Sequence, residues 1–209
     1  YYGRQFLFRT ADRGEHWTRI SPDLTRPTLT VPPNLDAATV EQSRPFGERR
    51  GVIYAIAGSP LAAGTLWVGT DDGLVWRTDD DGGHWLNVTP AGLAPWSKIG
   101  ILEASHFDRE SAYAAVDRHR VNDYAPHVYR THDGGKSWQH VAAGIPDGAF
   151  VNAVREDPVR RGLLYAATER GVFVSFDDGD AWQPLQNDLP PSSVRDLVVQ
   201  GNDLVIATH

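Results

Sequence analysis

The stretch of the sequence that is densest in reactive side chains runs from Asp117 to Pro126 and reads Asp-Arg-His-Arg-Val-Asn-Asp-Tyr-Ala-Pro. Its two arginines can each bind a carboxylate or a phosphate through paired hydrogen bonds, and the histidine between them can move protons near neutral pH. The tyrosine can stack on a sugar ring or a base. We predict a ligand-binding loop; the alternative is a solvated loop whose charges neutralise one another. The candidate residues are Asp117, Arg118, His119, Arg120, Asp123 and Tyr124.

Other candidates lie on further connections that we expect to face the same way. Trp96 is either a carbohydrate platform or an apolar plug against the neighbouring strands, and the plug is favoured. A glycoside hydrolase would need two carboxylates about 5–5.5 Å apart for retention or about 6.5–9.5 Å apart for inversion, and the sequence identifies no such pair. The further ligand candidates are Asp71, Asp72, Trp96, Glu169 and Arg170, and the acids to consider for hydrolysis are Asp71, Asp72, Asp117, Asp123, Asp147 and Glu169.

The elements that must position these residues are set by a repeat. Four segments, 10–17, 78–85, 131–138 and 175–182, share the pattern Ser/Thr-x-Asp-x-Gly-x-x-Trp, and we call them the repeat turns. An aspartate can accept hydrogen bonds from backbone N–H groups a residue or two ahead, and the glycine can adopt the positive φ that a tight turn needs. We expect the tryptophan to begin the return strand and cover the turn. The structural residues are Asp12, Gly14, Trp17, Asp80, Gly82, Trp85, Asp133, Gly135, Trp138, Asp177, Gly179 and Trp182.

Strand-like runs flank every repeat turn, and two more precede it wherever the chain is long enough. Each unit is then four short strands in about 45 residues, which is the period of a propeller blade. We predict a half blade (1–20), a long connection (21–51), blades at 52–89, 99–141 and 151–185, and a half blade (194–209). A short helical turn is expected only over Asp36–Gln42. The halves either pair into a fourth blade or belong to a larger propeller, and the absence of methionine favours the latter.

Strand direction alternates within a blade, so the loops sort onto two faces. The repeat turns should share one face with the loops at 58–64, 106–110 and 157–162. The connection after the second strand and the connection between blades should lie on the opposite face. That face is where the candidate loop 117–126 falls, and ligands are commonly bound where loops gather at one end of a scaffold.

The repeat turns resemble the Asp-box, or bacterial neuraminidase repeat, of sialidases, xyloglucan-degrading glycoside hydrolases, sortilin-type receptors and photosystem II assembly factors. The run from Leu163 to Trp182 looks most like bacterial sortilin-like or glycosyl-hydrolase-like proteins. The resemblance implies an all-β propeller but no single activity, because one scaffold hosts many functions. A non-catalytic module that binds a protein, peptide or glycan is preferred; a glycoside hydrolase and a structural or assembly-factor domain stay open. The resemblance favours an extracytoplasmic or secreted location.

The composition of the chain argues against several kinds of partner and of catalytic chemistry. The 209 residues include 20 basic and 27 acidic side chains, a net charge of −7, which argues against a nucleic-acid partner. There is no cysteine, so thiol catalysis and cysteine-ligated zinc are excluded. No apolar run approaches the ~18 residues that span a bilayer, so no membrane insertion is expected. The carboxylates of the repeat turns would suit calcium, but none has the spacing of a dedicated calcium loop, and we predict neither metal nor cofactor.

Overall fold

A computed structural model describes residues 1–27, 35, 38 and 51–209. Apart from Ala38, the predicted turn over Asp36–Gln42 falls outside these residues, and so does much of the long connection 21–51. Within the described part of the chain, no helix is long and apolar enough to cross a membrane.

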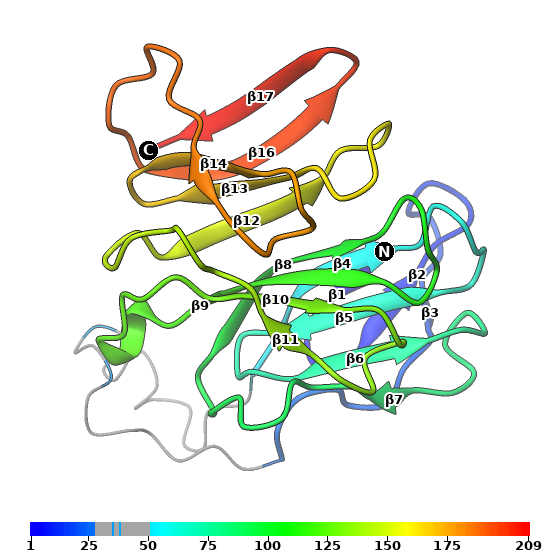
Figure 1. Cartoon of the computed structure of the whole chain (residues 1–209). Helices are drawn as coiled ribbons and strands as arrows, with labels where there is room; N and C mark the ends of the chain where they lie inside the picture. Colours follow the sequence, from blue (N-terminus) through cyan, green and yellow to red (C-terminus); the bar gives the residue numbers. More distant parts are fainter. Residues whose placement is uncertain (28–34, 36–37, 39–50) are drawn as a thin grey trace.

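Five antiparallel sheets follow one another along the chain (Figure 1). Three of them have four strands, as predicted, and the last is a two-stranded hairpin. The first sheet has three strands where two were expected, because Tyr2–Gly3 pairs with the strand that follows it. The sheets are β1 (Tyr2–Gly3), β2 (Leu7–Arg9) and β3 (Thr18–Arg19); β4 (Ile53–Gly58), β5 (Leu66–Thr70), β6 (Val75–Thr78) and β7 (Leu86–Asn87); β8 (Lys98–Ala104), β9 (Ala112–Asp117), β10 (Val128–Thr131) and β11 (Gln139–His140); β12 (Val151–Glu156), β13 (Leu164–Thr168), β14 (Gly171–Ser175) and β15 (Gln183–Pro184); and β16 (Val194–Gln200) with β17 (Asp203–Thr208).

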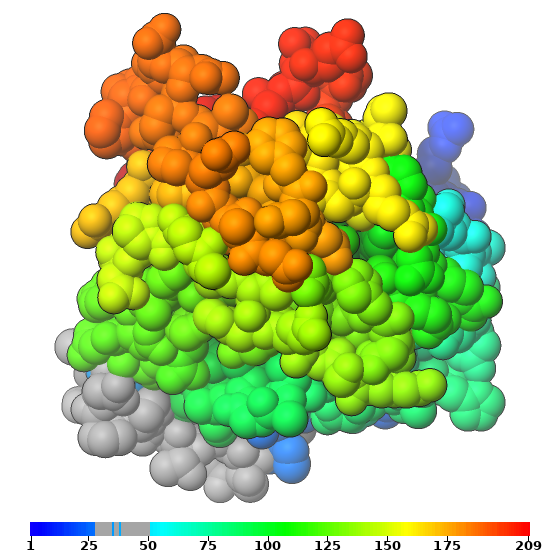
Figure 2. Space-filling view, in the orientation of Figure 1, coloured from blue at the N-terminus to red at the C-terminus, as the bar shows by residue number. Residues whose placement is uncertain are grey.

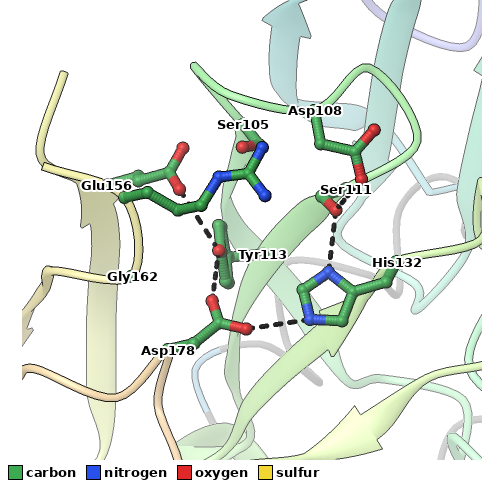
Figure 3. Close-up of a pocket in the computed structure, with 9 residues that line it drawn as sticks. Ser105, Asp108, Ser111, Tyr113, His132, Glu156, Gly162 and Asp178 are labelled. Atoms are coloured by element: carbon green, nitrogen blue, oxygen red, sulfur yellow. Dashed lines mark hydrogen bonds and ion pairs between the residues drawn. The ribbon is translucent and has the colours of Figure 1, made fainter. Parts of the chain in front are cut away.

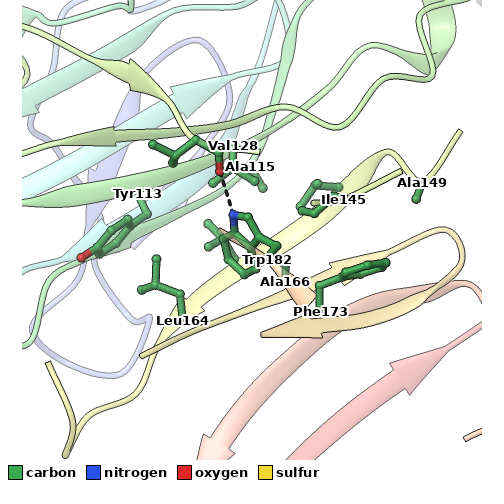
Figure 4. Packing of buried hydrophobic residues seen from close by; sticks show 12 residues of the cluster. Tyr113, Ala115, Val128, Ile145, Ala149, Leu164, Ala166, Phe173 and Trp182 are labelled. Atoms are coloured by element: carbon green, nitrogen blue, oxygen red, sulfur yellow. Dashed lines mark hydrogen bonds between the residues drawn. The ribbon is translucent and has the colours of Figure 1, made fainter. Parts of the chain in front are cut away.

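The core lies between successive sheets rather than within any one of them. The largest cluster joins the sheet β8–β11 to the sheet β12–β15 and includes Tyr113, Leu164, Phe173 and Trp182 (Figure 4). Equivalent clusters fill the other junctions. Each four-stranded sheet therefore buries both faces, which explains why its second strands are almost continuously apolar. The all-β class with four-stranded blades is as the sequence predicted.

The repeat turns are closed by their own aspartate and hydroxyl side chains. In the second turn Asp80 Oδ1 accepts the backbone N–H of His84 at 2.8 Å, and Thr78 Oγ1 accepts that of Gly82 at 3.0 Å. The same pair of bonds recurs in the other three turns. The aspartate thus reaches four residues ahead, farther than predicted. The turn glycines have positive φ, from 83° to 100°, as predicted.

Three of the four repeat tryptophans bridge neighbouring sheets, whereas the indole N–H of Trp17 donates to Gly14 O of its own turn at 3.1 Å. The indole N–H of Trp85 donates to Ile20 O at 2.9 Å, that of Trp138 to Val88 O at 2.7 Å and that of Trp182 to Val141 O at 2.8 Å. Each acceptor follows the outermost strand of the preceding sheet. The prediction that the tryptophan covers its own turn is therefore wrong for these three residues.

Arginines on the strands that lead into the repeat turns make a second set of bridges, in the opposite direction along the chain. Arg9 contacts Asp81 of the next sheet at 2.9 Å, Arg77 contacts Glu110 at 2.7 Å and Arg130 contacts Asp178 at 3.1 Å. The tryptophan and the arginine together join the first four sheets, each to the next, at the repeat-turn side.

The predicted sorting of loops onto two faces is confirmed by backbone bonds. Asp81 N–H donates to Gly64 O at 3.0 Å, Gly134 N–H to Glu110 O at 2.8 Å and Asp178 N–H to Gly162 O at 2.9 Å. These bonds place the first loop of each blade beside its repeat turn, so the connection 117–126 lies at the other end of the sheets (Figure 1).

Candidate functional site

A polar pocket opens along the first strands of four successive sheets, and we call it the inner-strand pocket. It has a volume of about 310 Å³ and draws residues from β4, β8, β12 and β16 and from the end of β9. Since the first strand of a blade is the innermost one, the pocket occupies the place of a propeller's central channel. Its lining is Tyr54, Lys98, Gly100, Ile101, Asp117, His119, Asn152, Arg195 and Asp196.

Lys98 supplies a cation held between an aromatic ring and a carboxylate. Its ammonium lies 4.1 Å from the centroid of the Tyr54 ring and 3.7 Å from Asp117 Oδ2. The separation from Asp117 is that of an ion pair without a short hydrogen bond, so the ammonium keeps donors for another acceptor. The Tyr54 side of the pocket is open, since this residue is 54% exposed.

Asp117 and His119 form the wall contributed by the predicted loop. Asp117 is 5% exposed, and its Oδ1 lies 2.6 Å from His119 Nδ1 and accepts the His119 backbone N–H at 3.0 Å. The imidazole stacks on Phe150 with ring centroids 5.1 Å apart. A short 3-10 helix, η2 (His119–Val121), follows directly and fixes the direction of the loop.

Arg195 provides a second cation on β16. Its Nη2 lies 3.4 Å from Glu169 Oε2, which also accepts a hydrogen bond from Ser193 Oγ at 2.9 Å. Next to it, Asp196 contacts Arg155 at 3.1 Å. Glu169 was predicted as a ligand residue, but it is absent from the lining of the pocket and forms an ion pair with the Arg195 guanidinium.

Hydrogen bonds and ion pairs within the predicted loop and with residues beside it fix its remaining side chains. Arg118 donates to Asp123 Oδ2 at 2.6 Å and also bonds to Ser97 Oγ, and His127 Nε2 lies 3.1 Å from the same Asp123 oxygen. Partial burial raises the pKa of Asp123, but the bonds from Arg118, the Ala125 N–H and His127 outweigh it and the pKa is lowered overall. Tyr124 is half exposed and its ring lies 6.3 Å from that of Phe150. Arg120, on η2, is partly exposed and is absent from the pocket lining.

Four of the remaining candidate side chains bond to the backbone or pack against other parts of the chain. Asp71 accepts the Val52 N–H at 2.7 Å, and Asp72 accepts the Arg26 N–H at 2.8 Å and the Thr70 hydroxyl. Trp96 is buried against Val121 and Leu35, so it has the plug role that the sequence favoured and no ring face for a sugar. Arg170 lies over Gly148. None of these four side chains lines the inner-strand pocket.

A second pocket, on the repeat-turn side, contains side chains that the sequence analysis did not connect (Figure 3). His132 lies between Ser111 Oγ, 2.7 Å from its Nδ1, and Asp178 Oδ2, 2.8 Å from its Nε2. Tyr113 donates to Asp178 at 2.5 Å. Burial, and to a smaller extent this hydrogen bond, raises the pKa of the phenol well above its usual range. These residues come from both sheets of one junction, so the network joins two blades. The spacing of Ser111, His132 and Asp178 along the chain carries no motif that could have revealed it.

Comparisons with known proteins agree on the fold. No protein-family model and no curated protein matches the sequence. Among solved structures, the chain is similar to YCF48 bound to D1 peptide, with 17% identity and a TM-score of 0.58 over 98% of this chain and 55% of that one. It is also similar to the GH74 xyloglucanase from Xanthomonas campestris, with 18% identity and a TM-score of 0.66 over 98% and 32% of the two chains. An ancestral GH74 enzyme gives 17% identity and a TM-score of 0.62 over 87% and 21%.

These similarities, together with the four-stranded sheets packed in series, define the chain as a β-propeller protein. At such low identity the likeness extends to the fold alone. The chain spans about half the length of the YCF48 structure and a third or less of the GH74 structures that it resembles.

Proposed function

We propose that this chain is a non-catalytic propeller module that binds a peptide segment of a partner protein in the inner-strand pocket, and that its four repeat turns are Asp-boxes. The observation that carries the proposal is the pair of cations, Lys98 and Arg195, on inner strands two blades apart, with the side chain of Asn152 between them on β12. The YCF48 structure supports it by analogy, since a protein of the same fold is described there with a peptide.

The chemistry of the pocket suits a peptide better than a glycan. The cations can bind a carboxylate of the peptide, and Asp117 and Asp196 can accept its N–H groups. A sugar would stack on an aromatic face, and although the Tyr54 ring is half exposed, the Lys98 ammonium occupies one of its faces at 4.1 Å.

The same geometry favours binding over hydrolysis. A glycosidase needs one carboxyl that can donate a proton and a second that faces the substrate. Asp117 is bonded to His119 and paired with Lys98, and Asp71 and Asp72 hold backbone N–H groups of their own region. All three acids already have partners, so we assign none of them the role of proton donor to a substrate.

Selection from a displayed peptide library on the immobilised chain, with a glycan array in parallel, tests the proposal. The selected peptide is then titrated calorimetrically into the wild type and into Lys98→Gln and Arg195→Gln. Each variant should weaken binding about tenfold, which is the usual size of one lost charge-assisted bond. Lys136→Gln, which removes an exposed cation from the third repeat turn on the other face, is the matched control and should change nothing. Recovery of glycans only, or equal affinity in all variants, would overturn the proposal.

A further inference from the structure

Two imidazoles meet at the outer edge of the sheet β8–β11, and neither belongs to the linings of the two polar pockets described above. His127 lies directly before β10, at the end of the loop 117–126, and His140 is the last residue of β11. Their facing nitrogens, Nδ1 of His127 and Nε2 of His140, are 3.3 Å apart. The His140 side chain is exposed, and Figure 2 shows this yellow-green edge at the surface of the molecule. We call these two residues the histidine pair.

Asp123 fixes which nitrogen of His127 carries the proton. Its Oδ2 lies 3.1 Å from His127 Nε2 and accepts a hydrogen bond from Arg118 at 2.6 Å. A carboxylate only accepts hydrogen bonds, so the proton of the neutral His127 imidazole is on Nε2, and Nδ1 keeps a lone pair on the side that faces His140. A carboxylate on the far nitrogen is also the arrangement that orients histidine ligands in metal sites.

Strand pairing and an aromatic contact hold the second imidazole. His140 lies opposite Tyr129 in the register of β10 and β11, and its ring meets the Tyr129 ring edge-on with centroids 5.1 Å apart. The two imidazoles are inclined to each other by 64°, so they are not stacked and their facing nitrogens stay open to an ion beside them. Both rings are thus fixed by neighbours other than each other, which is what a preformed metal site needs.

The separation of the two nitrogens matches a tetrahedral metal ion. Two nitrogens that each lie about 2.05 Å from a zinc ion at the tetrahedral angle are about 3.3–3.4 Å apart. A hydrogen bond at 3.3 Å is a long one, since most N–H donors lie about 2.7–3.2 Å from their acceptor. Imidazole suits zinc and the other late divalent transition metals, whereas calcium and magnesium take oxygen ligands.

A second group of ligand atoms among the described residues fits such an ion less well. Asp12, Glu15 and His16 of the first repeat turn bring a nitrogen and carboxylate oxygens close together. There His16 Nδ1 lies only 2.5 Å from Asp12 Oδ2, as a direct hydrogen bond. Atoms that close would subtend about 75° at a zinc ion, far below the tetrahedral angle. The histidine pair is therefore the better preformed of the two.

We propose that the histidine pair binds zinc or a similar late transition-metal dication through His127 Nδ1 and His140 Nε2, with water in the remaining positions. In the metal-free pair the His140 Nε2–H donates to His127 Nδ1. On binding, the exposed His140 ring transfers this proton through solvent to its own Nδ1, so both facing nitrogens present lone pairs and no proton is released overall. The ion then ties the end of the loop 117–126 to the outermost strand of its sheet, and its binding does not depend on the peptide function proposed above.

Calorimetric titration of zinc chloride into the full chain tests the proposal. His127→Gln and His140→Gln should each weaken binding by at least about tenfold, because each removes one of the two protein ligands and the loss of an outer partner alone costs about ten- to a hundredfold. His16→Gln, which removes the exposed histidine of the first repeat turn, is the matched control and should leave the affinity unchanged. A wild type that binds no zinc, or binding that is weakened by His16→Gln and by neither of the other substitutions, would overturn the proposal.

NMR of the imidazole nitrogens gives a second measurement that needs no variant. In the metal-free wild type His127 should carry its proton on Nε2, as its contact with Asp123 requires. Zinc should shift the resonances of His127 Nδ1 and His140 Nε2, while His127 Nε2 keeps its proton. A metal-free His127 with its proton on Nδ1, or zinc-induced shifts confined to other histidines, would overturn the proposal.

Discussion

Replacing each repeat tryptophan by alanine, one at a time, tests how the blades are held together. Trp182 is buried in the largest cluster and donates a hydrogen bond to Val141 O, whereas the Trp17 side chain is half exposed and donates to Gly14 O of its own turn. Truncating a buried tryptophan costs about 3–5 kcal/mol, and the lone Val141 carbonyl adds to that cost if water does not replace the bond. Trp17→Ala, at an exposed position, should cost no more than about 0.5 kcal/mol.

Urea denaturation followed by circular dichroism measures this difference, at a protein concentration where every variant is monomeric. The two variants have the same substitution at the same place in the repeat, so the change in composition is identical. A loss of about 3 kcal/mol corresponds to a fall of about 6–12 °C in Tm for a chain of this size. Trp182→Phe should recover part of the loss by refilling the cavity. Equal destabilisation by Trp17→Ala and Trp182→Ala would refute the argument that the tryptophans join neighbouring blades.

Three further predictions concern the repeat turns and the bridges between blades. Hydrogen bonds from the side chain and the backbone N–H of His84 hold the pKa of Asp80 at about 2, below its usual 3.8. The stability that ionised Asp80 adds is therefore complete above about pH 4 and is lost as the pH falls towards 2. An Asp80→Asn variant should lose less stability in acid, as measured by urea midpoints from about pH 6 to about pH 2. Gly82→Ala should lower the free energy of unfolding by at least about 1 kcal/mol more than Gly92→Ala does. Both glycines have positive φ, but the new Cβ would meet Ile20 O at Gly82 and nothing within 4 Å at Gly92. Equal urea midpoints of the two variants would contradict this. Arg77→Met should raise the pKa of Glu110 towards its ordinary value, since the bond from Arg77 is the main cause of its depression, and an unchanged carboxyl titration by NMR would show that the bridge is not formed in solution.

The repeat made the fold predictable. Four copies of one turn signature located the hairpins, and the alternation of strand direction then placed the loops on two faces without any knowledge of packing. The role of the tryptophans was not predictable, because a tryptophan beside a turn has the same sequence signature whether it covers that turn or crosses to the next sheet. The choice depends on the approach of the preceding blade, as the bond from Trp138 to Val88 O shows.

The candidate site was predictable only in part. Asp117 and His119 were found because an insertion of charged residues stood out against short loops elsewhere. Asn152 and Arg195 were missed, since a polar residue within a first strand carries no signal of its own in the sequence, and only the packing of successive blades brings these side chains to one pocket with Lys98. Trp96, Asp71 and Asp72 have the residue types of a binding site, but burial and local hydrogen bonds commit them to the framework.

The most direct test of the proposed binding function is NMR mapping of the selected peptide on the full chain. Backbone amide shifts should change around Lys98, Asn152 and Arg195 on the inner strands β8, β12 and β16 and around Asp117 at the end of β9, while amides of the repeat turns stay unchanged. Shifts that cluster instead at the repeat turns, or around the pocket of Ser111, His132 and Asp178, would contradict the assignment of the ligand site to the inner-strand pocket.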